Sequence, residues 1–214
     1  MKREEKKLPK ATAKRLPLYL RYLKMLEQDG IHRIKSHNFS EVTQVPSATI
    51  RRDFSYIGEL GRSGYGYEVS YLIEVLSKFL EIGQRKNIAL IGCGNLGTAL
   101  MNNNFRRDGN LEIVCAFDSD ESRIGQTIRG TKVLDIRDFK QYVDEQQLAL
   151  VISTVPSEYA QEAIDIVVKS GIKSILNFAP ERVKVPSGVH VQYIDLTSEV
   201  QTLLLYDKAL EEVK

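Results

Sequence analysis

The 214-residue sequence has little of several residue types that carry chemistry or crosslinks: no tryptophan, two cysteines and three histidines. Two cysteines cannot form the disulfide framework of a small secreted domain, and no histidine and cysteine cluster has zinc-site spacing. Unbroken apolar runs are only a few residues long, whereas a membrane-spanning helix needs about 20. The start of the sequence is charged, with no apolar segment behind it, unlike a secretory signal. We therefore expect a cytoplasmic globular protein without a membrane segment or a metal site.

The composition is ordinary, but the charge is unevenly distributed. Hydrophobic residues make up 43% and charged residues 27% of a length that allows one or two domains. Residues 1–62 carry 14 Lys and Arg against 7 Asp and Glu, a net +7, whereas residues 87–214 carry 13 against 18, a net −5. The basic front predicts a surface that meets phosphates; the alternatives are an anionic membrane or a chance excess on a solvated face.

The basic part has the helical pattern of a helix-turn-helix. Apolar residues repeat at helical spacing from Leu16 and end before Gly30, and Ser36 can cap a short second helix. Pro46 forces extended backbone on the residue before it, which fits a tight turn. Ser47 then is a natural N-cap for a third helix.

The third helix divides into an apolar face and a polar face. Its core-facing residues are expected to be Ile50, Phe54 and Ile57, at positions i, i+4 and i+7. Arg51 and Arg52 lie outside this stripe, as a recognition helix in the major groove requires. A generic three-helix interaction module is the alternative.

A glycine-rich turn and a further helix complete this domain. Four glycines in the nine residues 58–66 predict a tight turn between short strands, with Arg62 near its tip. Such a basic turn beside a recognition helix is a wing, which can reach the minor groove. An amphipathic helix from Val69 would close at Gly83, so we place a winged-helix DNA-binding domain at residues 1–83. The residues assigned to DNA contact are Arg15, Ser47, Thr49, Arg51, Arg52, Ser55, Tyr56, Arg62 and Gly64.

The rest of the chain alternates strands and helices. Continuous apolar strands separated by helices predict a parallel sheet that is covered on both faces. The expected strands are 88–91, 111–117, 132–134, 148–153, 174–178 and 189–194, and the expected helices start at 98 or span 137–146 and 157–169. The predicted class is α/β, with a doubly wound domain at residues 84–194.

A glycine motif opens this domain. Gly92, Gly94 and Gly97 form G-x-G-x-x-G directly after a strand, and Asp118 ends the next strand, 21 residues after the third glycine. In this Rossmann context the glycines let a pyrophosphate approach a helix N-terminus, and the acid accepts hydrogen bonds from the adenine ribose. A carboxylate there repels a 2′-phosphate, which favours NAD and NADH over NADP(H). The intervening Cys93, Asn95 and Leu96 are assigned to the same site.

Two later loops follow strands on the other side of the switch point. We assign these loops to the nicotinamide half of the cofactor. The alternative is that they are ordinary strand-to-helix turns with no role in binding. The residues are Thr154, Val155 and Pro156 in one loop and Asn177, Phe178 and Ala179 in the other.

The sequence predicts a protein that is not an enzyme. Only about 20 residues follow the last strand, so no substrate domain fits. Cys93, near a helix N-terminus, could have a lowered pKa, but redox chemistry there would compete with the cofactor; Cys115 is expected in the core. Two alternatives stay open: a small NAD-dependent oxidoreductase, and a coenzyme A or nucleotide-binding protein.

The last segment, residues 195–214, is an amphipathic helix that either packs on its own domain or reaches into a partner. Its apolar residues near one face are Leu196, Val200, Leu203, Leu204 and Leu210. An exposed apolar terminal helix favours a homodimer, and helix-turn-helix proteins read paired half-sites as dimers.

Taken together, these segments resemble the Rex family of bacterial transcriptional repressors that sense NADH and NAD⁺. The resemblance covers nearly the whole chain. It rests on the segments 15–21, 50–58, 64–67, 92–97, 154–156, 177–180 and 194–196, in that order.

The resemblance implies a homodimer that binds double-stranded operator DNA and is released by NADH. It also implies that Arg51 and Arg52 contact DNA from the recognition helix, and Arg62 and Gly64 from the wing. The C-terminal helix would be swapped between subunits. Arg21 would pair with Asp195 of the swapped helix in the DNA-competent state, so that this pair couples cofactor to domain angle.

Two positions depart from the family pattern. Asn103 stands where many members have a tyrosine near the nicotinamide, and Leu196 stands where some have phenylalanine. These departures concern the discrimination of NADH from NAD⁺, not cofactor binding itself.

Overall fold

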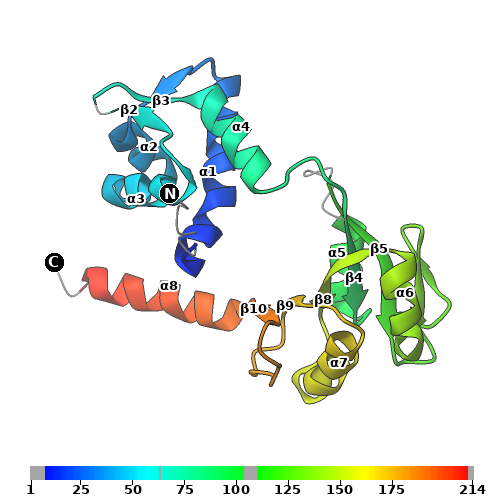
Figure 1. Ribbon diagram of the computed structural model, residues 1–214. Helices are drawn as coiled ribbons and strands as arrows, with labels where there is room; N and C mark the ends of the chain where they lie inside the picture. The colour runs from blue at the N-terminus through cyan, green and yellow to red at the C-terminus, as the bar shows by residue number, and fades with distance from the viewer. Residues whose placement is uncertain (1–7, 63, 104–109, 212–214) are drawn as a thin grey trace. The chain divides into compact units, whose positions relative to one another are not determined.

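The structure is a computed structural model that describes residues 8–62, 64–103 and 110–211 (Figure 1). The chain divides into two compact units, residues 1–84 and 85–214. This division lies one residue after the boundary expected from the sequence. Each unit has its own buried core.

The first unit is a winged helix-turn-helix. Its elements are α1 (Lys10–Gln28), β1 (Arg33–Ile34), α2 (Ser36–Thr43), α3 (Ser47–Ile57), β2 (Gly61–Arg62), β3 (Gly66–Glu68) and α4 (Val69–Phe79). The three short strands form an antiparallel sheet in the order β1-β3-β2. Strand β1 has only two residues and no periodic pattern, so the sequence did not predict it.

Aromatic rings hold the helices of this unit together. Tyr19 of α1 lies 5.7 Å from the ring of Phe39 in α2 and 5.5 Å from that of Phe54 in α3. Phe54 also meets Tyr67 of the wing edge-on at 5.1 Å. The expected core face of the third helix is confirmed for Ile50 and Phe54, which are buried, while Ile57 is partly buried against the same core.

The helix ends of this unit differ from the sequence prediction in detail. Ser47 is the first residue of α3 rather than its N-cap; Pro46 takes that position, and no side chain caps the helix. Ser36 likewise begins α2 behind Lys35. Neither serine hydroxyl therefore caps its helix. Helix α4 ends at Phe79, four residues before Gly83.

The second unit is a doubly wound Rossmann domain. Its elements are β4 (Lys86–Ile91), α5 (Asn95–Asn103), β5 (Leu111–Asp118), β6 (Thr127–Ile128), β7 (Thr131–Asp135), the 3₁₀ turn η1 (Ile136–Asp138), α6 (Phe139–Glu145), β8 (Leu148–Ser153), α7 (Ser157–Lys169), β9 (Ser174–Asn177), β10 (His190–Tyr193) and α8 (Leu196–Glu211). The strand order is β10-β9-β8-β4-β5-β7-β6, and all pairs are parallel except that of β6 with β7.

This order places the chain reversal between β4 and β8. The loops that follow these two strands, residues 92–94 and 154–156, therefore lie side by side at the carboxyl edge of the sheet, where ligands of such folds bind. The sheet has a core on each face, as predicted. The edge strand β6 was not predicted, and the helix expected at 137–146 begins as the 3₁₀ turn η1.

The C-terminal helix α8 exposes its apolar residues in the single chain. Leu196, Val200, Leu203, Leu204, Leu205 and Tyr206 are each 57–68% exposed. Of the two arrangements expected from the sequence, packing on its own domain is therefore not seen for these residues. The side chain of Leu210 lies outside the described residues.

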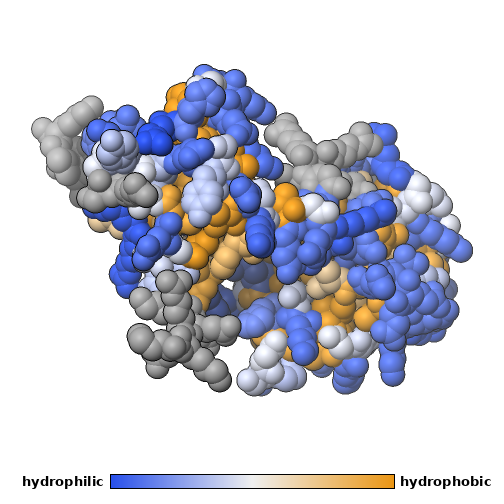
Figure 2. Space-filling view, turned by 45° about the horizontal axis from the view of Figure 1, so that its top comes forward, coloured by the Kyte–Doolittle hydropathy of each residue, from blue (hydrophilic) through white to orange (hydrophobic). Residues whose placement is uncertain are grey.

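Elsewhere the surface is mainly hydrophilic, as the face shown in Figure 2 illustrates. Among the described residues, no helix is both long enough and apolar enough to cross a membrane.

Candidate nucleic-acid interface and cofactor site

Helix α3 presents the polar face that the sequence predicts. Arg51, Arg52 and Ser55 are exposed, and Ser47, Thr49 and Tyr56 are partly exposed. The guanidinium of Arg51 donates to the hydroxyl oxygen of Ser36 at 3.0 Å, which links the outer face of α3 to the start of α2. The start of α2 is thereby held beside the outer face of α3 at the surface.

A buried carboxylate fixes the inner face of α3. Asp53 is 1% exposed, although it lies next to the two arginines. It accepts hydrogen bonds from Thr12 at 2.8 Å, Tyr19 at 2.7 Å and both Nε and Nη2 of Arg15 at 2.6 and 2.8 Å. All these donors lie on α1, so the network clamps the recognition helix to α1. We call these four residues the Asp53 clamp.

The clamp changes the acid–base behaviour of its members. Burial alone would raise the pKa of Asp53, but the hydrogen bonds from Arg15, Tyr19 and Thr12 outweigh it and hold that pKa below its ordinary value. The hydrogen bond to Asp53 raises the pKa of Arg15. Burial, with the same carboxylate, raises the pKa of Tyr19. The sequence predicts that Arg15 contacts DNA, but two of its N–H donors are engaged with Asp53 inside the protein.

The wing is built on close backbone contacts. A Cβ on Gly61 would lie within 2.9 Å of the Tyr67 ring and the Gly66 carbonyl, and one on Gly66 would lie 2.6 Å from the carbonyl oxygen of Ile34. Gly64, at a φ of +81°, is exposed in the turn. The side chain of Arg62 and the whole of Ser63 lie outside the described residues.

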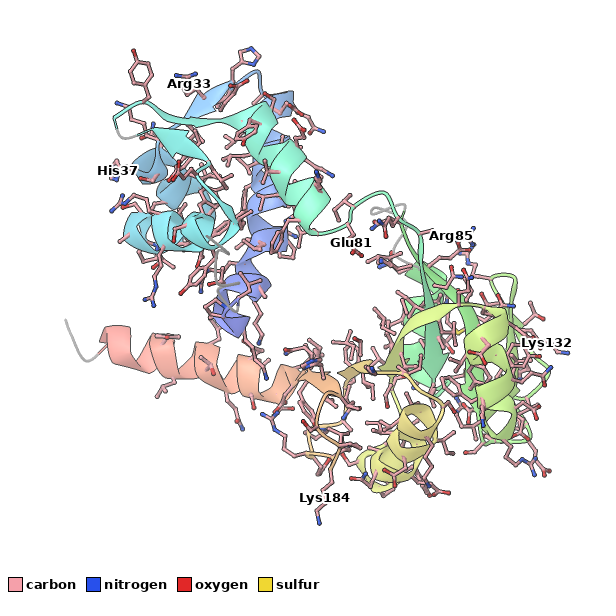
Figure 3. The ribbon with its side chains drawn as sticks, viewed as in Figure 1. Arg33, His37, Glu81, Arg85, Lys132 and Lys184 are labelled. Carbon is pink, nitrogen blue, oxygen red and sulfur yellow. The ribbon has the colours of Figure 1, made fainter. Side chains whose placement is uncertain are left out.

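Arg33 supports the wing from the neighbouring strand (Figure 3). Its guanidinium lies 5.7 Å from the ring centre of Tyr65. A hollow of about 320 Å³ beside these residues is bordered also by Glu68 and Tyr71. It has no phosphate-binding loop, so the cofactor site is to be found in the second unit.

The glycine motif leaves no room for larger side chains at two of its three positions. Gly92 has a φ of +89°, and a Cβ there would meet Val155 at 2.9 Å. A Cβ on Gly97 would overlap the carbonyl oxygen of Gly92. Gly94 is different: a Cβ would meet only Arg123, at 3.5 Å, so its open side faces outward. Since the first N–H groups of a helix lack partners within it, the loop fits a dinucleotide's pyrophosphate at Gly94.

Asp118 holds the glycine loop as well as facing the site. Its Oδ2 accepts from the backbone N–H of Cys93 at 2.7 Å, and its Oδ1 accepts from the N–H of Asp120 at 3.0 Å. Each carboxylate oxygen has a second lone pair, which leaves acceptors for ribose hydroxyls. Arg123, missed by the sequence analysis, lies with Nη1 4.0 Å from Oδ2.

Of the two later loops, the first contacts the glycine loop, and the second is held by hydrogen bonds within itself. The hydroxyl of Thr154 donates to the Gly92 carbonyl at 2.6 Å, and Val155 packs against Gly92. Asn177 is fully buried. Its side-chain amide donates a hydrogen bond to the carbonyl of Ala179 in the same loop and accepts one from the Ala179 N–H. Leu96 is 40% exposed beside the loop. Contacts of these loops with a nicotinamide stay a prediction.

A slot opens between the end of β5 and α7. It measures about 100 Å³, far more than one water needs. Its lining residues are Ile91, Gly92, Asp118, Ser119, Ile136, Val155, Tyr159, Glu162, Ala163 and Ile166. The four residues of α7 follow the spacing i, i+3, i+4, i+7, so one face of that helix forms a wall. This wall was not predicted from the sequence, although the helical spacing of its residues after Pro156 is present there.

Both cysteines are shielded rather than reactive. Burial, together with the nearby Asp118 carboxylate, raises the pKa of Cys93 to about 12. The lowered pKa considered for Cys93 from its place near a helix N-terminus is therefore wrong, because burial and the Asp118 carboxylate both disfavour the thiolate. Burial raises the pKa of Cys115 to about 12 as well, in line with its expected core position.

The two residues of the proposed switch lie at the surface of their own units. Arg21 is exposed on α1, with its guanidinium 5.8 Å from the ring centre of Tyr22. Asp195 precedes α8 and accepts from the N–H groups of Thr197 and Ser198 at 3.0 and 3.1 Å. The hydrogen bond from the Ser198 hydroxyl is the main reason that the pKa of Asp195 is lowered.

A winged helix-turn-helix joined to a dinucleotide-binding Rossmann domain defines the class of ligand-responsive DNA-binding proteins. Family models agree with this division: one described as "Putative DNA-binding protein N-terminus" matches residues 7–55, and one described as "CoA binding domain" matches residues 83–181. The chain is 62% identical to the redox-sensing transcriptional repressor Rex 2 of Enterococcus faecalis over 95% of both chains. It is 52% identical to Rex of Latilactobacillus sakei, over 94% of this chain and 97% of the relative.

Solved structures give the same result. RSP, a Rex-family repressor crystallised with NAD⁺ and operator DNA, is 31% identical, with a TM-score of 0.86 over 97% of both chains. RSP with NADH gives 0.83 at 30% identity, over 98% of this chain and all of that one. The chain belongs to the Rex family of redox-sensing transcriptional repressors.

This membership confirms the fold, the repressor function and the NAD(H) cofactor expected from the sequence. The prediction that the chain is not an enzyme is also confirmed, because the relatives are transcriptional repressors. The oxidoreductase alternative is therefore set aside. Family membership favours NAD(H) over coenzyme A, although both ligands share an adenosine diphosphate that this kind of domain can hold.

Proposed function

We propose that this chain represses transcription as a cytoplasmic homodimer that leaves its operator when NADH binds. The observation that carries the proposal is the joining, in one chain, of an exposed arginine face on α3 to a glycine loop shaped for a pyrophosphate. One surface meets DNA and the other meets the cofactor. The chain's own residues must then carry the signal between them.

On the DNA side, Arg51 and Arg52 extend from α3 into the major groove, and the wing at Gly64 approaches the minor groove. Arginine pairs well with guanine, and finds enhanced negative potential in a narrow minor groove. Ser47, Thr49, Ser55 and Tyr56 border the same face and suit phosphate contacts. Arg15 acts mainly through the clamp, because its donors are engaged with Asp53.

On the cofactor side, the open face of Gly94 and the start of α5 receive the pyrophosphate, and Asp118 accepts from the adenine ribose. The nicotinamide acts as a signal through its redox state and does not react, since no residue of the site is assigned to hydride transfer. The loops at 154–156 and 177–179 border the nicotinamide half. A 2′-phosphate would meet the Asp118 carboxylate, which favours the non-phosphorylated cofactor.

The exposed apolar face of α8 supports a homodimer in which this helix is swapped. Its exposed leucines would be covered by the partner subunit, which removes apolar area from water. In the DNA-competent state, Arg21 would pair with Asp195 of the partner subunit. NADH would favour a state without that pair, so the two ligands bias one element in opposite directions.

The test is selection from a pool of random duplex DNA at fixed salt, with no cofactor, with NAD⁺ and with NADH. We expect a palindromic site that NADH abolishes and NAD⁺ spares. Gly94→Ala is the matched variant: the added Cβ meets little of the protein but fills the cofactor's approach, so selection should persist while the NADH response is lost. Selection of no sequence, or a response to coenzyme A in place of NADH, would reject the proposal.

A further inference from the structure

The slot beside Asp118 ends at a carboxylate that the described residues leave without a partner. Glu162 lines this slot from α7, and within the described part of the chain no hydrogen bond or ion pair engages it. Glu162 is exposed, so its carboxylate is open to a ligand that enters the slot. We infer that Glu162 reads the 6-amino group of the adenine base and thereby selects the adenine dinucleotide, an inference that rests on the proposed NADH binding.

The position of the slot relative to the ribose acceptor points to the base. Asp118 forms one border of the slot and is the acceptor proposed for the adenine ribose. A base attached to that ribose enters the adjoining space. The pyrophosphate takes another direction from Asp118, along the glycine loop.

The walls of the slot suit a flat aromatic ring. Ile136, Val155 and Ile166 supply apolar sides, and Tyr159, which is 59% exposed, can lay its ring along the opening. Apolar and aromatic walls with few polar groups are typical of sites for purines. They give affinity without telling one purine from another.

Glu162 supplies what the walls lack. A carboxylate only accepts hydrogen bonds, so it pairs with an exocyclic amine and opposes a carbonyl oxygen in the same place. Adenine carries an amine at position 6, whereas hypoxanthine carries a carbonyl there. Tyr159 and Glu162 are three residues apart on α7 and therefore lie on one face of the helix, next to the same part of the ring.

The wall that carries Glu162 is held in place. The side-chain amide of Gln161 accepts from the backbone N–H of Lys184 at 2.8 Å and donates to its carbonyl at 3.0 Å. These bonds tie α7 to the loop between β9 and β10, while the side chain of Lys184 extends away from the domain (Figure 3). A fixed helix face gives the carboxylate a defined direction.

The experiment compares NADH with reduced nicotinamide hypoxanthine dinucleotide, in the full chain without DNA. Both ligands fluoresce through the reduced nicotinamide, so one titration signal serves both. We expect wild type to prefer NADH by about tenfold, the size of one hydrogen bond to a charged group. In Glu162→Gln the preference should fall to about twofold or less, because an amide can donate as well as accept.

The matched control is Glu158→Gln. Glu158 is exposed one turn earlier on α7 and does not line the slot, so this variant makes the same charge change and should keep the wild-type preference. Equal binding of the two ligands by wild type, a preference for hypoxanthine, or an unchanged preference in Glu162→Gln would each overturn the inference. Failure of wild type to bind NADH would instead reject the proposed function.

Discussion

The recognition helix of the first unit and the glycine motif of the second are held in place mainly by different means. In the first, side chains do the holding: the Asp53 clamp joins α3 to α1 through four hydrogen bonds from α1, and aromatic rings fill the space between the helices. In the second, the backbone does it: Gly92 and Gly97 bring chain segments closer than any side chain permits.

This difference teaches which changes each unit tolerates. The DNA-binding unit should be sensitive to side-chain chemistry, because a lost donor or acceptor leaves a buried partner unsatisfied. The Rossmann unit should be sensitive to volume, because a single added carbon meets backbone atoms that cannot swing aside. The following changes test that contrast, starting with the largest expected effect.

Gly97→Ala should have the largest effect. The new Cβ would overlap the Gly92 carbonyl, and we expect a loss of about 3 kcal/mol in unfolding free energy, the upper end of the range for overpacking. Denaturant unfolding measures it, and Gly94→Ala, with free space around its Cβ, is the control. A Gly97→Ala protein as stable as the control would show that the loop can move apart.

Asp53→Ala should destabilise the first unit by roughly 3 kcal/mol, the low end for breaking a buried ion pair, since Arg15 keeps some access to solvent. The loss should appear in denaturant unfolding followed by tyrosine fluorescence, while NADH affinity stays unchanged. Glu59→Ala removes an exposed acid of the same unit and should be neutral. Similar unfolding of the two variants would contradict the clamp.

Arg51→Ala should weaken specific DNA binding by about 2 kcal/mol, the middle of the range for one bidentate contact with a base. Cofactor affinity should not change. Ser36→Ala, which removes only the hydroxyl that Arg51 contacts, should have a smaller effect on the same electrophoretic or anisotropy titration. If the Arg51→Ala variant bound the operator as tightly as wild type, α3 would not be the recognition helix.

Asp118→Ala should weaken NADH by about 1.5 kcal/mol, the low end for hydrogen bonds to a charged group, and weaken DNA binding far less. Asp120→Ala is the control, because Asp120 does not contact the glycine loop. The unfolding temperature should be measured alongside, since Asp118 also braces Cys93. Equal NADH affinity in Asp118→Ala would reject the ribose role.

The smallest effect is expected from lowering the pH, which should reduce folding stability through protonation of Asp53. Because the pKa of Asp53 is lowered on folding, its contribution is fully present above the unfolded value of about 3.9 and is lost as pH falls through the lower folded value. Stability of wild type should therefore fall between pH 5 and pH 2 more steeply than that of Asp53→Ala. Parallel pH profiles from denaturant unfolding would mean that the clamp does not titrate.

Much of this architecture follows from local patterns in the sequence. The spacing from Gly92 to Asp118 predicted both the loop and the carboxylate that faces it, because strand, turn and helix are consecutive there. Strand β8 and helix α7 were predicted with their observed bounds, since continuous apolar runs and helical spacing are strong signals.

Features made by distant residues could not be predicted. Asp53 meets Thr12, Arg15 and Tyr19 across 34 to 41 residues, and an acid that directly follows two exposed arginines has no pattern that marks it as buried. Strands β1 and β6 have two residues each, too few for any period. The slot wall at Tyr159 and Glu162 looks like ordinary helix surface until β5 is placed beside it.

The double role of Asp118 limits how such a sensor can change its cofactor. The carboxylate proposed to select the ribose also fixes the backbone N–H of Cys93, so its replacement by a residue that welcomes a 2′-phosphate would also remove a brace of the glycine loop. Conversion to a phosphorylated dinucleotide therefore needs at least two coordinated substitutions. An engineer should first restore the brace from another position and only then alter Asp118.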